Sequence, residues 1–531
     1  MRRFTAFIAI ALIGVGVFAQ APGKTRPQSD RLSSQERRGK EIYFGVAASS
    51  GPPIKALIGD PPTETPGTMM ACANCHGEDG KGKPEGGVVP SDITWEALTK
   101  PYGVTHPSGR THPPYTERLL VRAVCMGFDP ASNKLHAAMP RFQMSREDIS
   151  ALTAYLKRLG REIDPALSDS TIRIGTILPA TGPLAEAGLA IRLVLAAYFD
   201  EINKQGGIYN RRIELSVAEL GASPAESAAN VEKLLTETRP IALVAALTAG
   251  ADREIVAACE KNQVPLIGPL TVFAETGYPA SRHTFYLLSG VEQQARALID
   301  YSRKELRTAH SRIAIVYSRE SVSAELVETI KRHCSQSGWE TVTAVNGRIE
   351  GFGSSGLAQK LKGAGEDLVL LLASGSEARL FAEAAEQTGW APALLIPGSL
   401  ASNNLFELRP TFENRLFLAL PSVPSDQTQA GSSEYKALAE GYNLPSAQMA
   451  SQIAALCSAK VLGQGLKLAG RAVTREKLVT TLEGLYDFDT GLMPKIGFGR
   501  DRRIGALGAY IVTIDQRRKQ FRFVTGWLGL D

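Results

Sequence analysis

Residues 72–76 read Cys72-Ala73-Asn74-Cys75-His76, which is the pattern C-x-x-C-H. Two thiols at this spacing can add to the two vinyl groups of one porphyrin, and the adjacent histidine can then bind its iron. The sequence holds no second C-x-x-C pair that would complete a zinc site. The stretch therefore predicts one covalent haem c, attached through Cys72 and Cys75, with His76 as an axial ligand of the iron.

The second axial ligand is predicted downstream of this motif. Met139 is followed by Pro140 and flanked by Leu135 and Phe142. A thioether is a soft ligand that favours Fe(II), so it raises the reduction potential relative to a second imidazole. Other side chains of this region compete for the role, and they are Met126, Met144, His106, His112 and His136. The proline and the flanking pattern favour Met139.

The residues around the motif carry further signals. Gly77-Glu78-Asp79-Gly80-Lys81-Gly82 follows it, and a segment from Asp129 to Phe142 contains the Met-Pro pair. These stretches resemble the C-H-G-x-x-G-x-G and G-x-D…L…M-P-x-F patterns of bacterial cytochromes c. The resemblance implies a small all-α cytochrome c domain, which we place at 34–163. Helices are expected over 34–44 and from Ser145 to Leu159, and residues 47–68 are expected to form an inserted surface loop.

The N-terminus has the pattern of a secretory signal over 1–21. Arg2 and Arg3 precede the apolar run 4–18, and Ala19-Gln20-Ala21 offers a small-x-small cleavage site. A membrane anchor is the alternative, but the run is short for a span. We therefore predict export to the periplasm with cleavage near Ala21, followed by a flexible lead-in over 22–33.

Composition sets outer limits on the function. The chain has 531 residues, of which 44% are hydrophobic and 21% charged, and this composition is typical of a globular protein. The net charge of +5 includes the two N-terminal arginines, so the sequence predicts no nucleic-acid partner. Four further cysteines stand alone, and we expect small buried side chains rather than a dense disulfide framework. They are Cys125, Cys259, Cys334 and Cys457.

From residue 171 onwards, strand patterns alternate with helix patterns. The expected strands share short apolar runs, and they cover 172–177, 212–217, 241–245, 264–267, 312–317, 368–372 and 393–396. Such alternation predicts parallel sheets. Because about 360 residues are too many for one sheet, we expect two α/β lobes. Residues 164–170, rich in Asp, Pro and Ser, are expected to link this region to the first domain.

Two parts of this region carry motifs. Its opening contains Ile172-Arg173-Ile174-Gly175, Thr181-Gly182-Pro183 and Gly206-Gly207-Ile208, and its end contains Phe488-Asp489-Thr490-Gly491 with Ile496-Gly497-Phe498. Together they resemble the branched-chain amino-acid binding proteins, which are type I periplasmic solute-binding proteins of ABC importers. The resemblance covers 171–531.

That resemblance implies two lobes joined by three crossovers. We place the crossovers near Ser289-Gly290, Leu420-Pro421 and Gly499-Arg500. Lobe 1 then spans about 171–289 and 421–499, and lobe 2 about 290–420 and 500–531. A small-molecule ligand would bind between the lobes at the carboxyl ends of the strands, and a hinge motion would close over it.

Seven residues align with the ligand-contacting loops of that family, and they are Thr248, Ala249, Leu270, Thr271, Val322, Ser374 and Ser399. Val322 and Ser374 stand where the family has cleft tyrosines. Ser399 stands where it has the acid that binds the ligand's ammonium group. Because an ammonium group buried without a carboxylate is costly, we expect a small neutral or anionic ligand rather than an α-amino acid.

These patterns favour an electron carrier fused to a solute-binding domain, serving a periplasmic dehydrogenase or a respiratory chain. We expect no enzyme activity, since the sequence lacks a G-x-S-x-G elbow, a P-loop and an H-E-x-x-H motif. The open alternatives are a component of an ABC importer that docks on its permease, a ligand or redox sensor, and catalysis at the haem. Catalysis would need an open iron position, which Met139 argues against.

Overall fold

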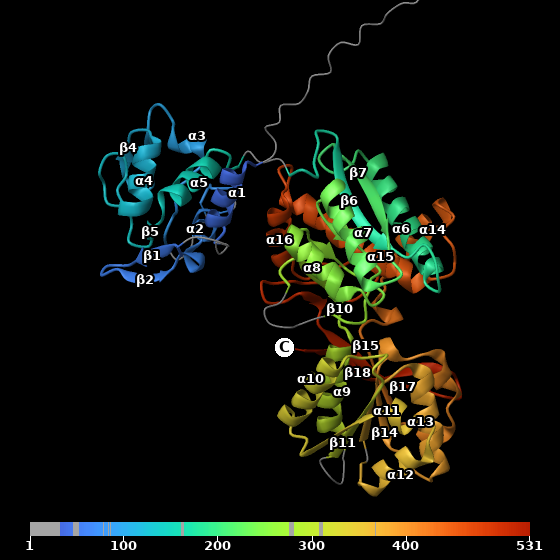
Figure 1. The fold of residues 1–531 in the computed structure, drawn as a ribbon. Coiled ribbons are helices and arrows are strands. Elements are labelled where there is room, and N and C mark those ends of the chain that lie inside the picture. The colour runs from blue at the N-terminus through green and yellow to red at the C-terminus, as the bar shows by residue number, and fades with distance from the viewer. Residues whose placement is uncertain are drawn as a thin grey trace, which may run out of the picture. The chain divides into compact units, whose positions relative to one another are not determined.

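The computed structural model describes residues 32–45, 52–77, 79–82, 84, 87–160, 164–274, 281–306, 312–366 and 368–530. The chain divides into two compact units, Met1–Glu162 and Ile163–Asp531 (Figure 1). The predicted signal peptide lies outside the described residues, as does nearly all of the lead-in. Among the helices that are described, none is long and apolar enough to cross a membrane.

The first unit is built from short helices with two small antiparallel sheets (Figure 1). Its helices are α1 (Ser34–Tyr43), η2 (Gly67–Met70), α2 (Cys72–His76), α3 (Trp95–Leu98), α4 (Glu117–Met126) and α5 (Arg146–Leu156). Its strands are β1 (Lys55–Ile58), β2 (Thr63–Pro66), β3 (Val104–Thr105), β4 (Thr111–His112) and β5 (Arg141–Gln143). The sheets have the orders β2-β1-β5 and β3-β4.

Helices α1 and α5 pack closely against each other within this unit. A Cβ atom on Gly39 would lie 2.0 Å from the carbonyl oxygen of Ala151, so only glycine allows this approach. Tyr43 packs its ring against Tyr155, with ring centroids 5.6 Å apart, and donates its hydroxyl to the carbonyl of Gly77 at 2.6 Å. Through Tyr43, this pair of helices holds Gly77, which directly follows the C-x-x-C-H motif.

The prediction of a surface loop over 47–68 is wrong at 55–66. Residues 55–66 form the hairpin β1–β2, and β1 pairs with β5 through Ala56 and Phe142. Both side chains are buried, with exposed fractions of 0% and 4%. Local sequence patterns cannot predict pairing between strands that are far apart in the chain. Here such pairing adds a small sheet to a domain predicted to be all-α. Residues 46–51 lie outside the described part.

The second unit contains two lobes, each a sheet with helices packed on it (Figure 1). Lobe 1 has the sheet order β16-β10-β9-β8-β6-β7, in which all pairs are parallel. Its strands are β6 (Thr171–Leu178), β7 (Arg212–Glu219), β8 (Leu243–Val244), β9 (Leu266–Ile267), β10 (Thr284–Leu288) and β16 (Ile504–Ala506). Its helices are α6 (Ala185–Lys204), α7 (Pro224–Glu237), α8 (Asp252–Asn262), α14 (Gln429–Gly441), α15 (Met449–Ala469) and α16 (Arg475–Glu483).

Lobe 2 has the order β12-β11-β13-β14-β15-β17-β18, with antiparallel pairing only at β15-β17-β18. Its strands are β11 (Arg312–Tyr317), β12 (Thr341–Asn346), β13 (Leu368–Leu372), β14 (Ala393–Pro397), β15 (Leu416–Leu420), β17 (Gly508–Asp515) and β18 (Gln520–Gly529). Its longer helices are α9 (Val291–Glu305), α10 (Ala324–Gln336), α12 (Ser355–Gly363) and α13 (Gly375–Gln387). The short turns are α11 (Gly347–Glu350), η3 (Gly398–Leu400), η4 (Asn403–Glu407) and η5 (Pro410–Phe412), with η6 (Pro424–Asp426) after β15.

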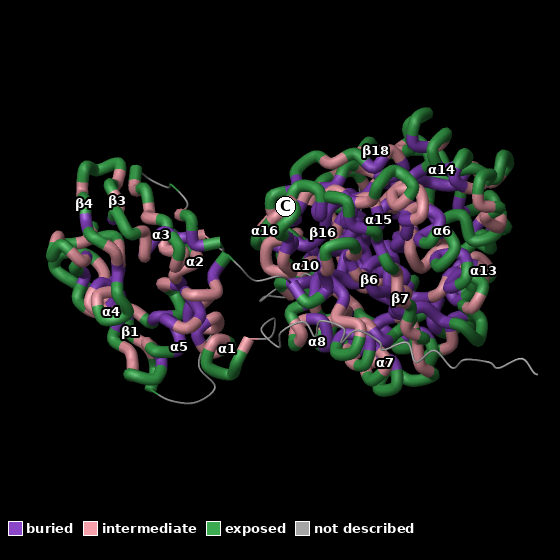
Figure 2. Tube along the Cα trace, turned by 90° about the horizontal axis from the view of Figure 1, so that it is seen from above, coloured by how far each residue is buried: buried purple, intermediate pink, exposed green. Residues whose placement is uncertain are grey.

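Burial explains why the central strands read as continuous apolar runs. All five residues of β13 have an exposed fraction of 0%, as expected for a parallel strand covered by helices on both faces. Figure 2 shows buried residues concentrated inside the second unit, along strands such as β6, and exposed residues on outer helices such as α7.

The chain passes between the lobes after β10, after β15 and between β16 and β17. The third crossover therefore lies at Leu507, and the predicted position near Gly499-Arg500 is wrong. Strand β16 pairs with β10 of lobe 1, and a three-residue strand is too short to recognise from sequence. Ser289 ties two crossovers together, because its hydroxyl donates to Ala506 and accepts from the Gly508 amide.

The predicted linker at 164–170 is largely part of the second unit. Ala166 is fully buried, and Asp164 accepts a hydrogen bond from the backbone amide of Arg475 at 3.0 Å. The amide of Arg173 donates to the carbonyl of Ala166 at 3.0 Å. A short polar segment can therefore belong to a folded domain when its backbone groups find hydrogen-bond partners there.

Candidate functional site

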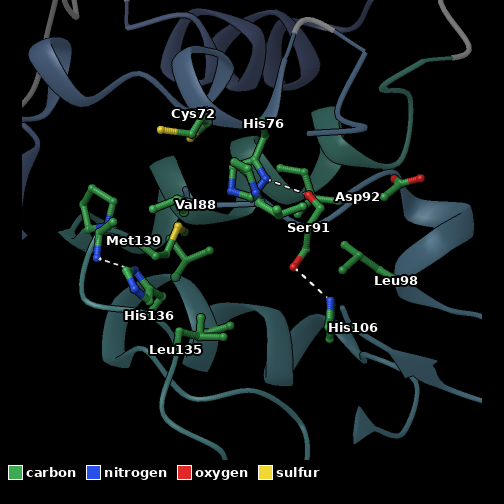
Figure 3. A pocket seen from close by; sticks show the side chains of 18 of the residues that line it. Cys72, His76, Val88, Ser91, Asp92, Leu98, His106, Leu135, His136 and Met139 are labelled. Carbon is green, nitrogen blue, oxygen red and sulfur yellow. Dashed lines mark hydrogen bonds between the residues drawn. The ribbon is translucent and has the colours of Figure 1, made fainter. Parts of the chain in front are cut away.

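A cavity of about 1010 Å³ lies in the first unit. Its walls include Cys72, Cys75, His76 and Met139, so the structure brings together all four residues that the sequence assigned to a haem. Figure 3 shows His76 and Met139 directed into this space from segments far apart in the chain. The three motif residues come from α2, and Met139 comes from the loop between α4 and β5.

His76 is held in an orientation that suits an iron ligand. Its ring is buried, with an exposed fraction of 7%, and its Nδ1 lies 2.9 Å from the carbonyl oxygen of Ser91. A carbonyl only accepts, so Nδ1 carries the proton and Nε2 is left as the metal-binding nitrogen. Burial lowers the pKa of His76 below its ordinary value, which favours the neutral form that binds metal.

Cys72 and Cys75 lie on one turn of helix, which carries both sulfurs to the cavity wall. Burial raises the pKa of the Cys72 thiol to about 12, so this group stays protonated at neutral pH. All six cysteines lie in the described part of the chain, and none is paired in a disulfide.

The glycines that follow His76 are required by the protein's own packing. A Cβ on Gly80 would lie 2.5 Å from the side chain of Leu159, and one on Gly82 would lie 2.2 Å from the carbonyl oxygen of Pro90. Both residues have positive φ, 78° and 89°. The amide of Gly82 also donates to the carbonyl of His76 at 2.8 Å, which closes the turn behind the histidine.

Arg141 fixes the loop that carries Met139. Its guanidinium donates to the carbonyl oxygen of Met139 and, at 3.1 Å, to that of Leu135. Gly127 caps the carboxyl end of helix α4, and a Cβ there would lie 2.3 Å from Nε of Arg141. Strand β5 begins at Arg141 and is held by β1. The loop backbone is therefore tied down while the thioether faces the cavity.

The competing side chains differ in position and in hydrogen-bond partners. Met126 is 63% exposed, and Met144 packs against the hydrophobic core of the unit. His136 lines the same cavity, and its Nδ1 accepts a hydrogen bond from the amide of Ala138 at 3.2 Å. His106 and His112 also line the cavity, but they bond to each other, with 3.0 Å between their Nε2 atoms.

The remaining lining fits a porphyrin. Apolar side chains make up the interior, and they include Leu98, Leu120, Val124, Phe142, Leu152 and Leu156. Lys100 adds positive charge that suits the carboxylates of a haem, whereas Arg110 on the same cavity is paired with Asp129. A large apolar cavity with a few placed polar groups is the usual form of a cofactor site. Sequence reasoning missed Ser91 and Arg141, because a backbone contact and a clamp on a loop have no sequence motif.

In the second unit, the predicted cleft residues of lobe 1 lie on loops after β8 and β9. The hydroxyl of Thr248 donates to Asp252 at 2.7 Å, and that of Thr271 accepts from the Phe273 amide at 2.9 Å. Ala249 is exposed in the turn after Thr248, and Leu270 packs partly against the lobe core. Thr248 therefore uses its hydroxyl proton within its own lobe, whereas Thr271 accepts through its oxygen and keeps its O–H as a donor.

The predicted residues of lobe 2 are also engaged locally. Val322 is buried in the lobe core with an exposed fraction of 3%. Ser374 caps α13 in a capping box with Glu377, and Ser399 exchanges hydrogen bonds of 2.7 and 3.0 Å with Gln294 of α9. The S-x-x-E pattern that starts at Ser374 signals a helix cap in the sequence.

Among the residues that the structure describes, an ion pair crosses from lobe to lobe. Arg253 in the first turn of α8 pairs with Glu325 in the first turn of α10. The two side chains are 64% and 71% exposed. Such a solvated pair is worth little in energy, so it does not lock the lobes together.

Each of the two units matches a known protein family. A cytochrome c family model matches residues 68–160, and a periplasmic binding protein family model matches residues 171–519. The Leu/Ile/Val-binding protein BraC3 of Rhizobium johnstonii is 24% identical over 336 residues, which is 63% of this chain and 89% of the relative.

Solved structures resemble the fold of the second unit. One is a branched-chain amino acid ABC transporter protein from Thermus thermophilus with bound valine, at 15% identity and a TM-score of 0.54. It covers 68% of this chain and 97% of its own. Another is a fatty acid ABC transporter substrate-binding protein from Thermomonospora curvata, at 19% identity and a TM-score of 0.54, covering 70% of this chain and 95% of its own. The chain thus belongs to the periplasmic binding protein family and carries a cytochrome c domain ahead of the binding domain.

Proposed function

We propose that this protein is a periplasmic electron carrier with one covalent haem c, fused to a domain that binds a small solute. The observation that carries the proposal is that Cys72, Cys75, His76 and Met139 line one cavity. Bound there, haem would accept and release one electron. His76 and Met139 would both hold its iron, and an iron held by two protein ligands favours electron transfer over catalysis.

The redox partner is proposed to be a periplasmic dehydrogenase or a component of a respiratory chain. The solute would be the substrate, product or cofactor of that partner enzyme. Export, through a signal peptide cleaved near Ala21, is part of the same proposal, because both matched families work outside the cytoplasm.

For the ligand, we propose a small neutral or anionic molecule rather than an α-amino acid. The support is local: at the positions aligned with the family's ligand contacts stand a buried valine, a serine that caps a helix and a serine bonded to Gln294. None of these side chains carries the negative charge that an ammonium group needs.

The test is native mass spectrometry of protein purified from its own periplasm, followed by calorimetry. We expect the mass of one haem on the full chain and a retained ligand without an α-ammonium group. Calorimetric titration with leucine and valine should give no heat of binding. Micromolar binding of either amino acid would refute the ligand proposal, and a chain without covalent haem would refute the electron-carrier proposal.

A second candidate is the binding component of an ABC importer with an appended cytochrome. The match to 89% of the length of a Leu/Ile/Val-binding protein favours it. Deletion of the chain would then abolish uptake of its ligand, whereas the Cys72→Ser, Cys75→Ser double variant would leave uptake intact. Loss of ligand-dependent respiration with normal uptake would instead support the electron carrier.

A further inference from the structure

Two histidines that the electron-carrier function does not require lie on the wall of the haem cavity. His112 ends β4, and His106 stands in the turn between β3 and β4. Their Nε2 atoms are 3.0 Å apart, and Nδ1 of His106 lies 3.2 Å from the hydroxyl of Ser91. Nδ1 of His112 lies 2.8 Å from the carbonyl oxygen of Pro113. Three side chains thus form one hydrogen-bonded chain.

The partners decide where the protons of this chain lie. The carbonyl of Pro113 only accepts, so Nδ1 of His112 carries a proton and its Nε2, in the neutral ring, is an acceptor. His106 must then donate from Nε2, which leaves its Nδ1 to accept the proton of the Ser91 hydroxyl. With both rings neutral, this single arrangement satisfies every hydrogen bond of the chain.

One further proton can enter without breaking the chain, and it fits at one atom. If Nδ1 of His106 is protonated, the Ser91 hydroxyl turns and accepts instead of donating. His112 offers no equivalent position, because its Nε2 already receives the N–H of His106. The carbonyl of the same Ser91 accepts from His76, so one residue joins the proton site to the iron ligand (Figure 3).

The surroundings of His106 favour its neutral form. Burial is the main cause that lowers the pKa of His106, Arg110 and the neighbouring His112 act in the same direction, and Asp129 opposes them. Arg110 is itself paired with Asp129 at 2.6 Å, and the ring of Tyr115 lies 4.9 Å from that of His112. The other charged groups of the cavity wall are Asp92, Lys100 and Lys134.

We propose that the chain of Ser91, His106 and His112 couples electron transfer at the haem to the uptake of one proton by Nδ1 of His106. On reduction, one electron arrives from the redox partner and one proton arrives from water, and on oxidation both leave. The added electron removes one positive charge from the cavity, so the proton binds more tightly in the reduced form. This inference rests on haem being bound as proposed above.

The first test uses the full haem-loaded chain and measures its reduction potential against pH. Protonation favours the reduced form, so the potential should fall as pH rises, by up to about 59 mV per pH unit, which is a tenfold change in equilibrium constant for one electron. Reduction in weakly buffered solution should also raise the pH, with up to one proton taken up per electron. A potential that is independent of pH, with no proton uptake, would overturn the inference.

Variants then identify the proton site. His106→Gln should give a flat potential, and Ser91→Ala, which keeps the carbonyl for His76, should move the sloping window to lower pH. His333→Gln in the second unit is the matched control and should keep the wild-type slope. A slope retained in His106→Gln would exclude His106. If His106→Gln fails to bind haem, proton uptake by the wild type still decides, and a wild type without haem would refute the electron-carrier proposal instead.

Discussion

Hydrogen bonds engage different atoms of the polar side chains in the haem cavity and in the loops between the lobes. In the cavity, hydrogen bonds engage the atoms that iron does not need: Ser91 holds Nδ1 of His76, and Arg141 holds the backbone of Met139. In the loops, the hydroxyls of Thr248 and Ser374 bond to carboxylates of their own lobe. A side chain is available to a ligand only when its functional atom is left free, and this distinguishes the two regions.

The largest expected effect concerns the attachment of haem to the first unit. Replacing Cys72 and Cys75 together with serine removes both attachment points, so the purified chain should lack covalent haem while its second unit still folds. Intact-mass measurement and thermal unfolding check the two parts. Cys125→Ser, a partly buried cysteine outside the motif, is the control and should keep haem. Covalent haem on the double variant would exclude the motif as the attachment site.

Replacing Met139 tests the second ligand. Met139→Ala should abolish the methionine–iron charge-transfer band and lower the reduction potential by on the order of 0.1 V, within the roughly 0.8 V that axial ligands span. Absorption spectroscopy and redox titration provide the readouts. Met126→Ala removes an exposed methionine of the same unit and should leave both unchanged. Survival of the band in Met139→Ala would show that another side chain binds the iron.

A smaller effect is expected when the support of that ligand is removed. Arg141→Gln leaves the carbonyls of Leu135 and Met139 without their donor, which costs about 1–3 kcal/mol. The methionine band should then be lost at a lower temperature on heating than in the wild type. Arg118→Gln, at an exposed position of α4, is the control. An unchanged midpoint in Arg141→Gln would mean that the pairing of β1 with β5 holds the loop alone.

The smallest expected effect tests the role of Ser374 in the loops between the lobes. If Ser374 serves only as the cap of α13, Ser374→Ala should lower the free energy of unfolding by about 1 kcal/mol and leave ligand affinity unchanged. Chemical unfolding and calorimetry with the retained ligand measure the two. Ser433→Ala, exposed on α14, should change stability by less than about 0.5 kcal/mol. A loss of affinity in Ser374→Ala would make this hydroxyl a ligand contact.

Elements with a strong local pattern could be predicted closely from the sequence. The strands at Arg312–Tyr317 and Leu368–Leu372 lie where their apolar runs indicated, because a strand buried on both faces must be apolar throughout. The helix at Ser34–Tyr43 begins one residue after its capping serine, as the S-x-x-E pattern at Ser33 implies.

Elements that depend on a distant partner could not be predicted. The hairpin at 55–66 exists because β1 finds β5, and the strand Ile504–Ala506 exists because it finds β10. Neither partner is near in sequence, and both strands are short. The predicted linker failed for a related reason, since Ala166 and Asp164 pack against residues of the second unit.

The sequence by itself determined the chemistry of the haem site, because attachment needs two thiols and a histidine in one contiguous turn of helix. It also determined the two families, because their motifs are local. Only the tertiary structure decided which atoms remain free to act. It placed Met139 and His76 on one cavity, bonded Ser399 to Gln294, and joined Ser91 to His106 and His112. Hydrogen bonds between segments far apart in the chain leave no local pattern in the sequence.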